Sequence, residues 1–263
     1  MVENRAIIKN TLTIIIFTLG LCFIYFPILV MIYHSFFATE GFGLATFSLR
    51  WYYKMISSGQ MMAALKNSVI VATVSTIISV TMSTLLVCGT VWYHPRFIFT
   101  IFQVSAIMPE IILAIGLLTF FALAGIPLGM TSLIIGHSII GLGIAIPIIK
   151  NALSHRDKLL IEAAMDMGAS RPRVVIDIIL PGIKASIAYA AFLVLTLSLD
   201  DFFIAYFCSG SSVLTISTFV YAQIRALPDP SLNALSTTLL FLSSTAVYGT
   251  VLLKGLSKKG MNK

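Results

Sequence analysis

The sequence predicts an all-α membrane protein with six transmembrane helices, and three observations support this prediction. Of the 263 residues, 58% are hydrophobic and only 10% are charged. The mean hydropathy is +1.00, whereas soluble domains are roughly half apolar and about a quarter charged. Six apolar stretches are also long enough to cross the hydrocarbon layer, which requires a helix of about 20 residues.

The predicted spans contain β-branched and aromatic residues without alternating polar and apolar positions, so helices are favoured over barrel strands. They cover residues 11–33, 64–92, 97–124, 131–150, 183–207 and 233–254. The first span follows basic residues, as a secretory signal would. Its apolar run is longer than that of an ordinary signal peptide, and no small-residue cleavage site follows. We therefore expect it to be retained, in a single transmembrane domain over residues 1–263.

The distribution of Lys and Arg predicts that both termini are cytoplasmic. With the N-terminus inside, thirteen of the 17 basic residues fall in inner segments, where such residues are retained. Membrane topology thus explains the net charge of +7. A nucleic-acid partner is not expected, because its footprint would be a clustered basic face, and the partner surface of the spans is membrane lipid.

Metal and nucleotide sites are not indicated by the sequence. The three cysteines and four histidines are scattered and show no ligand spacing. No glycine-rich phosphate loop ending in Gly-Lys-Ser/Thr occurs. We therefore expect no metal, no bound cofactor and no nucleotide site in this chain.

One inner segment, residues 151–181, is hydrophilic enough to leave the membrane and long enough for two short helices. Gly168 is placed to end the first helix, Pro172 to start the second, and Pro181 to separate the second helix from the fifth span. The small and apolar residues of this hairpin are expected to lack a core of their own; they are Ala163, Ala164, Met167, Ile178 and Ile179. Two interpretations remain open: docking into a groove of another protein, or an amphipathic hairpin resting on its own helix ends.

The same segment carries a family signature. The pattern is Glu162-Ala163-Ala164, three residues, Gly168, nine residues, Ile178, one residue and Leu180-Pro181. It resembles the EAA loop of binding-protein-dependent ABC importer permeases. The resemblance implies the type I (MetI-like) permease fold. It also implies a heterodimer with a sister permease, a dimer of cytoplasmic ATP-binding subunits that hydrolyse ATP, and an extracytoplasmic binding protein. This chain would then be a transport subunit without enzymatic activity, and the residues implied to couple it to the ATPase are Glu162, Ala163, Ala164, Gly168, Leu180 and Pro181.

Four further segments are similar to PotC-type permeases of spermidine/putrescine transporters: RWYYKM (50–55), MPEIILAIGLL (108–118), LSLDD (197–201) and PSLNALSTTLL (230–240). This resemblance implies a polyamine importer in the cell inner membrane. It places Trp51 and Ser198 in the substrate pathway, together with acids discussed next. One position departs from the subfamily, because Glu110 stands where aspartate is expected.

Three acidic residues, Glu110, Asp200 and Asp201, lie in the interior of predicted spans, and no Lys or Arg does. The lysines within the span bounds stand at most two residues from a span end; they are Lys66, Lys150, Lys184 and Lys254. A charge in mid-span costs about 2.5–3.5 kcal/mol on insertion scales, so such residues usually face a bundle interior or a wet cavity. Counted from the inner boundaries, Glu110 and Asp200 lie at similar heights of about 21 and 24 Å. Neighbouring helical residues point about 100° apart; we assign Asp200 to the pathway and Asp201 to a more structural or partner-facing role.

Acids without buried bases favour a cationic passenger such as a polyamine. Aromatic residues near the acids, Phe202, Phe203 and Tyr206, are candidates for cation–π contacts, although lipid contact is the more common role of such residues. His137 lies near the acid level and is expected to be a packing histidine. Two alternatives stay open: an ABC importer for another small solute, and an ion-coupled secondary transporter, for which intramembrane carboxylates are equally natural.

Overall fold

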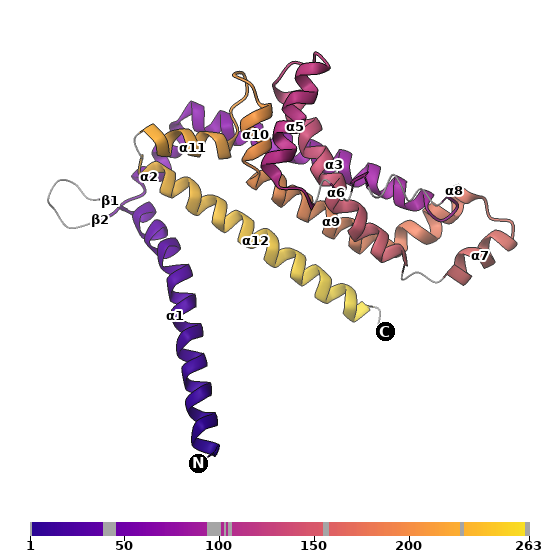
Figure 1. Cartoon of the computed structure of the whole chain (residues 1–263), viewed down its shortest axis with the longest axis horizontal. Helices are drawn as coiled ribbons and strands as arrows, with labels where there is room; N and C mark the ends of the chain where they lie inside the picture. Colours follow the sequence, from indigo (N-terminus) through magenta and orange to yellow (C-terminus); the bar gives the residue numbers. More distant parts are fainter. Residues whose placement is uncertain are drawn as a thin grey trace. The chain divides into compact units, whose positions relative to one another are not determined.

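The computed structural model describes residues 2–38, 46–93, 101–102, 104, 107–154, 158–226 and 229–260. Most of these residues are helical (Figure 1), which confirms the all-α prediction. The elements are α1 (Val2–Phe36), β1 (Phe37–Ala38), β2 (Thr46–Phe47), α2 (Arg50–Ser57), α3 (Gly59–Gly89), α5 (Glu110–Leu123), α6 (Met130–Ser154), α7 (Lys158–Asp166), α8 (Arg171–Val174), a π-helical turn (Val175–Ile179), α9 (Leu180–Asp200), α10 (Phe203–Cys208), α11 (Ile216–Ala226) and α12 (Ser231–Gly260).

Four helical segments within the described residues are long and apolar enough to cross a membrane: Thr13–Phe36, Gly59–Gly89, Met130–Leu153 and Arg171–Asp200. They correspond to the first, second, fourth and fifth predicted spans. The sixth predicted span falls within α12, and the shorter apolar helix α5 covers the end of the third. Residues 97–100, 103 and 105–106 of the third predicted span lie outside the described residues.

The chain divides into two compact units. The first comprises Met1–Gly59 and Gln223–Ser244, and in it the short helix α2 is held by polar contacts. The Tyr52 hydroxyl lies 3.0 Å from Ser35 Oγ, and Lys54 Nζ donates to Asp229 Oδ2 at 2.6 Å. Burial alone would raise the pKa of Asp229, but the hydrogen bonds from Lys54 and Ser231 outweigh it and lower the pKa.

The second unit comprises Gln60–Ala222 and Thr245–Lys263. Here α6 packs along α9, and α10 packs against α5 and α6 (Figure 1). Gly141 on α6 permits a close approach: a Cβ built there would lie 2.8 Å from both Ser79 Cβ and Val194 Cγ1. Ser79 Oγ lies 3.0 Å from the carbonyl of Ser138 across this contact and 2.7 Å from the carbonyl of Ser75 on its own helix. Small residues at helix crossings are typical of membrane bundles, where backbones pack closely.

The fifth predicted span differs from the structure at both ends. The helical path begins at Arg171 and continues into α9, so Pro181 does not separate the two segments as expected. A proline clashes with the carbonyl four residues earlier, and the preceding π-helical turn widens the backbone there, with the Leu180 N–H bonded to the carbonyl of Val175. At the other end, α9 stops at Asp200 because Asp201 is extended (φ −63°, ψ 123°).

The inner hairpin also differs in part from the expectation that its apolar residues have no core. Ile179 is fully buried in the core formed with α3, α6 and α9, and Ala164 and Ile178 pack against that core. Ala163 and Met167 are exposed, as is Glu162. Gly168 ends α7 with φ +85°, where the N–H groups of Gly168 and Ala169 bond to the carbonyls of Met165 and Ala164. This is the glycine helix end that the sequence predicts.

Candidate functional site

Two breaks in the helices bring acidic side chains to one place. Glu110 occupies the first turn of α5, directly after Pro109, whose extended ψ of 129° starts the helix. Asp201 lies between the end of α9 and the start of α10. Both Glu110 and Asp201 line one small cavity, whose other lining residues are His137, Ile140, Gly141, Ile144, Val194, Leu197 and Ser198. This lining contains two carboxyl groups and no Lys or Arg.

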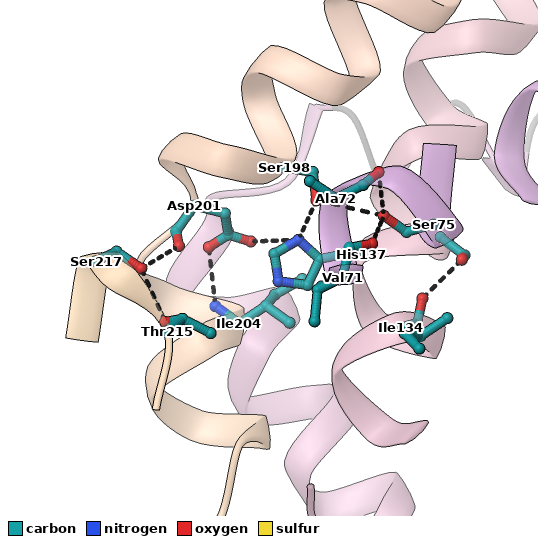
Figure 2. Close-up of polar contacts among 11 residues, drawn as sticks. Val71, Ala72, Ser75, Ile134, His137, Ser198, Asp201, Ile204, Thr215 and Ser217 are labelled. Atoms are coloured by element: carbon teal, nitrogen blue, oxygen red, sulfur yellow. Dashed lines mark hydrogen bonds and ion pairs between the residues drawn. The ribbon is translucent and has the colours of Figure 1, made fainter. Parts of the chain in front are cut away.

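Asp201 is held rigidly by its own backbone and by neighbouring loops (Figure 2). Its Oδ1 accepts the Ile204 N–H at 3.0 Å, which satisfies an N–H at the start of α10. Its carbonyl accepts the Ser217 hydroxyl at 2.9 Å. The side chain is 8% exposed, yet Oδ2 is buried without a hydrogen-bond partner among the described residues. The carboxylate therefore keeps a fixed orientation with one oxygen unpaired.

The cavity has a volume of about 50 Å³. About 10–15 Å³ of such space is enough to hold one water molecule, so the cavity fits a few water molecules or one small polar group and no extended molecule. An unpaired buried carboxylate oxygen is costly unless a donor or cation reaches it. The arrangement is thus suited to a small hydrated cation or to a single ammonium group.

The structure places Asp200 and Asp201 differently from the sequence expectation. Asp200 is exposed on the last turn of α9 and does not line the cavity, whereas Asp201 shares it with Glu110. The expectation assumed that the helix continues through both residues. Because α9 ends at Asp200, the next residue leaves the helical path, and its side chain turns toward Ile204 and His137.

Ser198 and His137 join the site from two helices (Figure 2). Ser198 Oγ lies 2.8 Å from His137 Nδ1 and 3.3 Å from Ser75 Oγ on α3. Sequence reasoning included Ser198 but missed Ser75 and Ser217. A signal for Ser75 was present, since Ser75, Ser79 and Ser83 recur every four residues along one face of the predicted second span.

The remaining predicted pathway residues lie apart from the cavity lining. Trp51 is on α2 in the first unit, and the chain's own cations face its ring: Arg50 Cζ is 5.3 Å and Lys54 Nζ 5.9 Å from the ring centroid. Phe202 and Tyr206 pack with Tyr221 in the second unit, with ring centroids 4.8–5.8 Å apart. These aromatic residues line no part of the acid cavity.

The comparison with protein families decides the class of this molecule. Residues 92–258 match the family described as "Binding-protein-dependent transport system inner membrane component". The chain belongs to this permease family. The match covers the acid cavity, apart from Ser75 nearby, and the whole inner hairpin, so the permease is an inner-membrane component of a transport system, as the EAA signature indicated.

Relatives extend the similarity over almost the whole permease. It is 30% identical to the spermidine/putrescine transport system permease protein PotC of Escherichia coli (strain K12) over 242 residues, which cover 90% of this chain and 92% of PotC. It is 31% identical to the putrescine transport system permease protein PotI of the same strain over 261 residues, covering 95% and 92% of the two chains.

Solved structures confirm the permease fold. A bacterial ABC transporter that imports the acidic polysaccharide alginate has a chain with a TM-score of 0.72 and 16% identity, covering 97% of this chain and 96% of that one. The MetNI methionine ABC transporter, in inward-facing form, has one with a TM-score of 0.58 and 19% identity, covering 74% and 97%. The MetI-like permease fold expected from the EAA loop is therefore the fold of this protein, with four clear candidate spans among the described residues.

Proposed function

We propose that this permease is the transmembrane subunit of an ATP-driven ABC importer that moves polyamines such as spermidine or putrescine into the cytoplasm. The observation that carries the proposal is the cavity shared by Glu110 and Asp201, with an unpaired carboxylate oxygen and no Lys or Arg in its lining. The names of the PotC and PotI relatives agree with this chemistry. An anion importer would instead need basic or N–H donors at such a place.

The size of the cavity limits what it binds to one end of a polyamine. An ammonium group is a compact, strongly hydrated donor without acceptors, so two carboxylates and the Ser198 hydroxyl can replace part of its water shell. The aliphatic remainder of the passenger would extend beyond the cavity. Asp200, exposed beside it, and Trp51 remain proposed pathway residues outside this pocket.

The inner hairpin is proposed as the contact for the cytoplasmic ATPase pair. Glu162, Ala163 and Met167 are exposed on and just after α7, with Met167 89% exposed, while the opposite face of the hairpin is anchored in the core through Ile179. An ordered small-residue surface with an acidic edge is suited to a groove on another protein. The charge bias of the loops supports cytoplasmic termini, with a binding protein at the outer face and a sister permease alongside.

Gly168→Val is expected to lower ATPase association and uptake several-fold. The positive φ of Gly168 costs an ordinary L-residue about 1–2 kcal/mol, and a β-branched side chain suits it least. Gly168→Asn is the matched control, because asparagine tolerates this conformation. The measurement is the ratio of ATPase to permease after mild-detergent purification, with uptake in parallel; equal ratios for both variants and the wild type would contradict the docking proposal.

The transport proposal is tested with the complete importer in proteoliposomes. ATP supplied on the ATPase side is expected to drive accumulation of labelled spermidine or putrescine, and excess unlabelled polyamine, but not an amino acid or an anionic oligosaccharide, is expected to compete. Uptake that survives ATP depletion and collapses with an uncoupler would instead identify an ion-coupled transporter. Competition by another solute class would identify a different importer.

A further inference from the structure

A polar chain of four side chains crosses the second unit from α3 to the start of α10 (Figure 2). Ser75 Oγ donates to the carbonyl of Val71 at 2.7 Å and lies 3.3 Å from Ser198 Oγ. Ser198 Oγ lies 2.8 Å from His137 Nδ1. The same nitrogen lies 4.0 Å from Asp201 Oδ2, beyond the range of a hydrogen bond. The imidazole thus stands between a hydroxyl that it bonds and a carboxylate that it does not.

The hydrogen-bond directions follow from the number of protons available. A hydroxyl has one proton, and the carbonyls of Val71 (2.7 Å) and Ala72 (3.2 Å) are nearer to Ser75 Oγ than Ser198 Oγ is (3.3 Å). We therefore assign the Ser75 proton to its own helix backbone and Ser75 as the acceptor from Ser198. The proton of Ser198 is then used as well, and Ser198 accepts from His137. This requires the proton of the imidazole to be on Nδ1 and leaves Nε2 as an acceptor. Nε2 has no partner among the described residues in either tautomer, so the directions of the Ser75 and Ser198 bonds decide the position of the proton.

The arrangement has a direct consequence for the carboxylate. With the single N–H of His137 assigned to Ser198, no donor among the described residues occupies Asp201 Oδ2. A residue without an acceptor in place of Ser198 would leave the Nδ1–H free to turn toward Asp201 Oδ2, where it would neutralise part of the negative potential that a cation encounters. Ser75 sets the donor and acceptor roles in this series of hydrogen bonds, because its own proton is assigned to the α3 backbone.

We infer that His137 is a positioning residue of the acid cavity: through its Nδ1–H bond to Ser198 it keeps Asp201 Oδ2 unpaired and available to the ammonium group of the passenger. This inference rests on the proposed polyamine function and assigns to His137 a role beyond the packing expected from the sequence. His137 would touch neither the ATPase nor the binding protein, so it affects the translocation step alone.

Two substitutions separate positioning from packing. Asparagine places its amide nitrogen near the position of Nδ1, whereas glutamine places it near that of Nε2. His137→Asn therefore keeps the donor to Ser198, and His137→Gln loses it. Glutamine is closer in size to histidine and the better helix former, so a packing role predicts that His137→Gln is the milder change. A positioning role predicts the reverse order.

The test measures polyamine uptake by the complete importer at varied concentrations of loaded binding protein, at equal amounts of assembled complex. The maximal rate of His137→Gln is expected to be about three- to tenfold below that of His137→Asn, as loss of one hydrogen bond implies. The half-saturating concentration should be unchanged in both, because docking of the binding protein is not affected. Ser198→Ala should remove the difference between the two variants.

Each outcome has a definite meaning. If the wild-type importer transports no polyamine, the proposed function fails first. If polyamine is transported and Asp201→Asn impairs it, but His137→Gln equals or exceeds His137→Asn, the positioning role is overturned and the proposed function stands. A second measurement uses the wild type and so does not depend on whether the variants assemble. ¹⁵N NMR of labelled histidine should show His137 protonated at Nδ1. Protonation at Nε2 alone would overturn the inference.

Discussion

Asp201→Asn is expected to lower the maximal rate of ATP-driven polyamine uptake about ten- to a hundredfold. Hydrogen bonds to charged groups contribute about 1.5–3 kcal/mol, and the substitution removes the charge while keeping the size of the side chain. The amide oxygen of asparagine can still accept the Ile204 N–H, which Asp201 Oδ1 accepts now. The start of α10 should therefore be preserved, and the loss should appear in transport rather than in folding.

The neighbouring residue provides the matched comparison. Asp200→Asn makes the same chemical change one position earlier, at an exposed site that does not line the cavity, and we expect the milder effect there. Glu110→Gln should resemble Asp201→Asn, and the two together should nearly abolish uptake. If Asp200→Asn is instead the more damaging change, the pathway follows the exposed side of α9, as the sequence analysis assigned it. If none of the three variants slows uptake, the acids have no transport role.

Gly141→Ala is expected to destabilise the permease by about 1–3 kcal/mol, the usual cost of forcing an extra group into a packed core. The added methyl would lie 2.8 Å from both Ser79 Cβ and Val194 Cγ1, and both of these are short branches close to the backbone. Helices α3, α6 and α9 meet at this point. The bundle must therefore shift, and the cavity that Gly141 also lines would change shape.

Gly116→Ala is the control, since a Cβ built at Gly116 on α5 meets nothing within 4 Å. Thermal unfolding of the purified permease in detergent measures the difference, and the yield of assembled importer measures its consequence. Ser79→Gly combined with Gly141→Ala should recover part of the loss, because it removes one of the two contacts. Equal melting temperatures for the two alanine variants would show that the crossing is looser than the structure indicates.

The sequence predicted the presence of the acids in the bundle better than their geometry. Counting along ideal helices placed Glu110 and Asp200 at similar heights, and an aspartate does meet Glu110, but it is Asp201. The segment LSLDDFF contains no glycine or proline, and the one local sign of the break is Asp201 itself, a residue type that is common at helix starts. The break is stabilised by distant partners, notably Ser217, and such tertiary contacts cannot be read from local propensity.

Two prolines show the same limit of prediction from local sequence: a helix starts after one and continues through the other. Pro109 interrupts the third predicted span, because it starts α5 and leaves Glu110 in the first turn. Pro181 was expected to end a helix, whereas the path continues through a π-helical turn. In both cases the local constraint was correct, because proline removes one backbone bond. Whether the helix stops or continues there depends on packing, and near Pro181 the π-helical turn contains Ile179, which is buried in the core.

The continuous helical path from Arg171 to Asp200 contains 30 residues, which makes a rod about 45 Å long. One end starts beside the hairpin that we propose the ATPase holds, and the other ends at the residue before Asp201. Such a rod works as a lever: a tilt of about 5° about one end displaces the other by about 4 Å. Asp201 follows directly after this end and Glu110 lies on α5, so a small rotation at the inner face would change the separation of the two carboxylates.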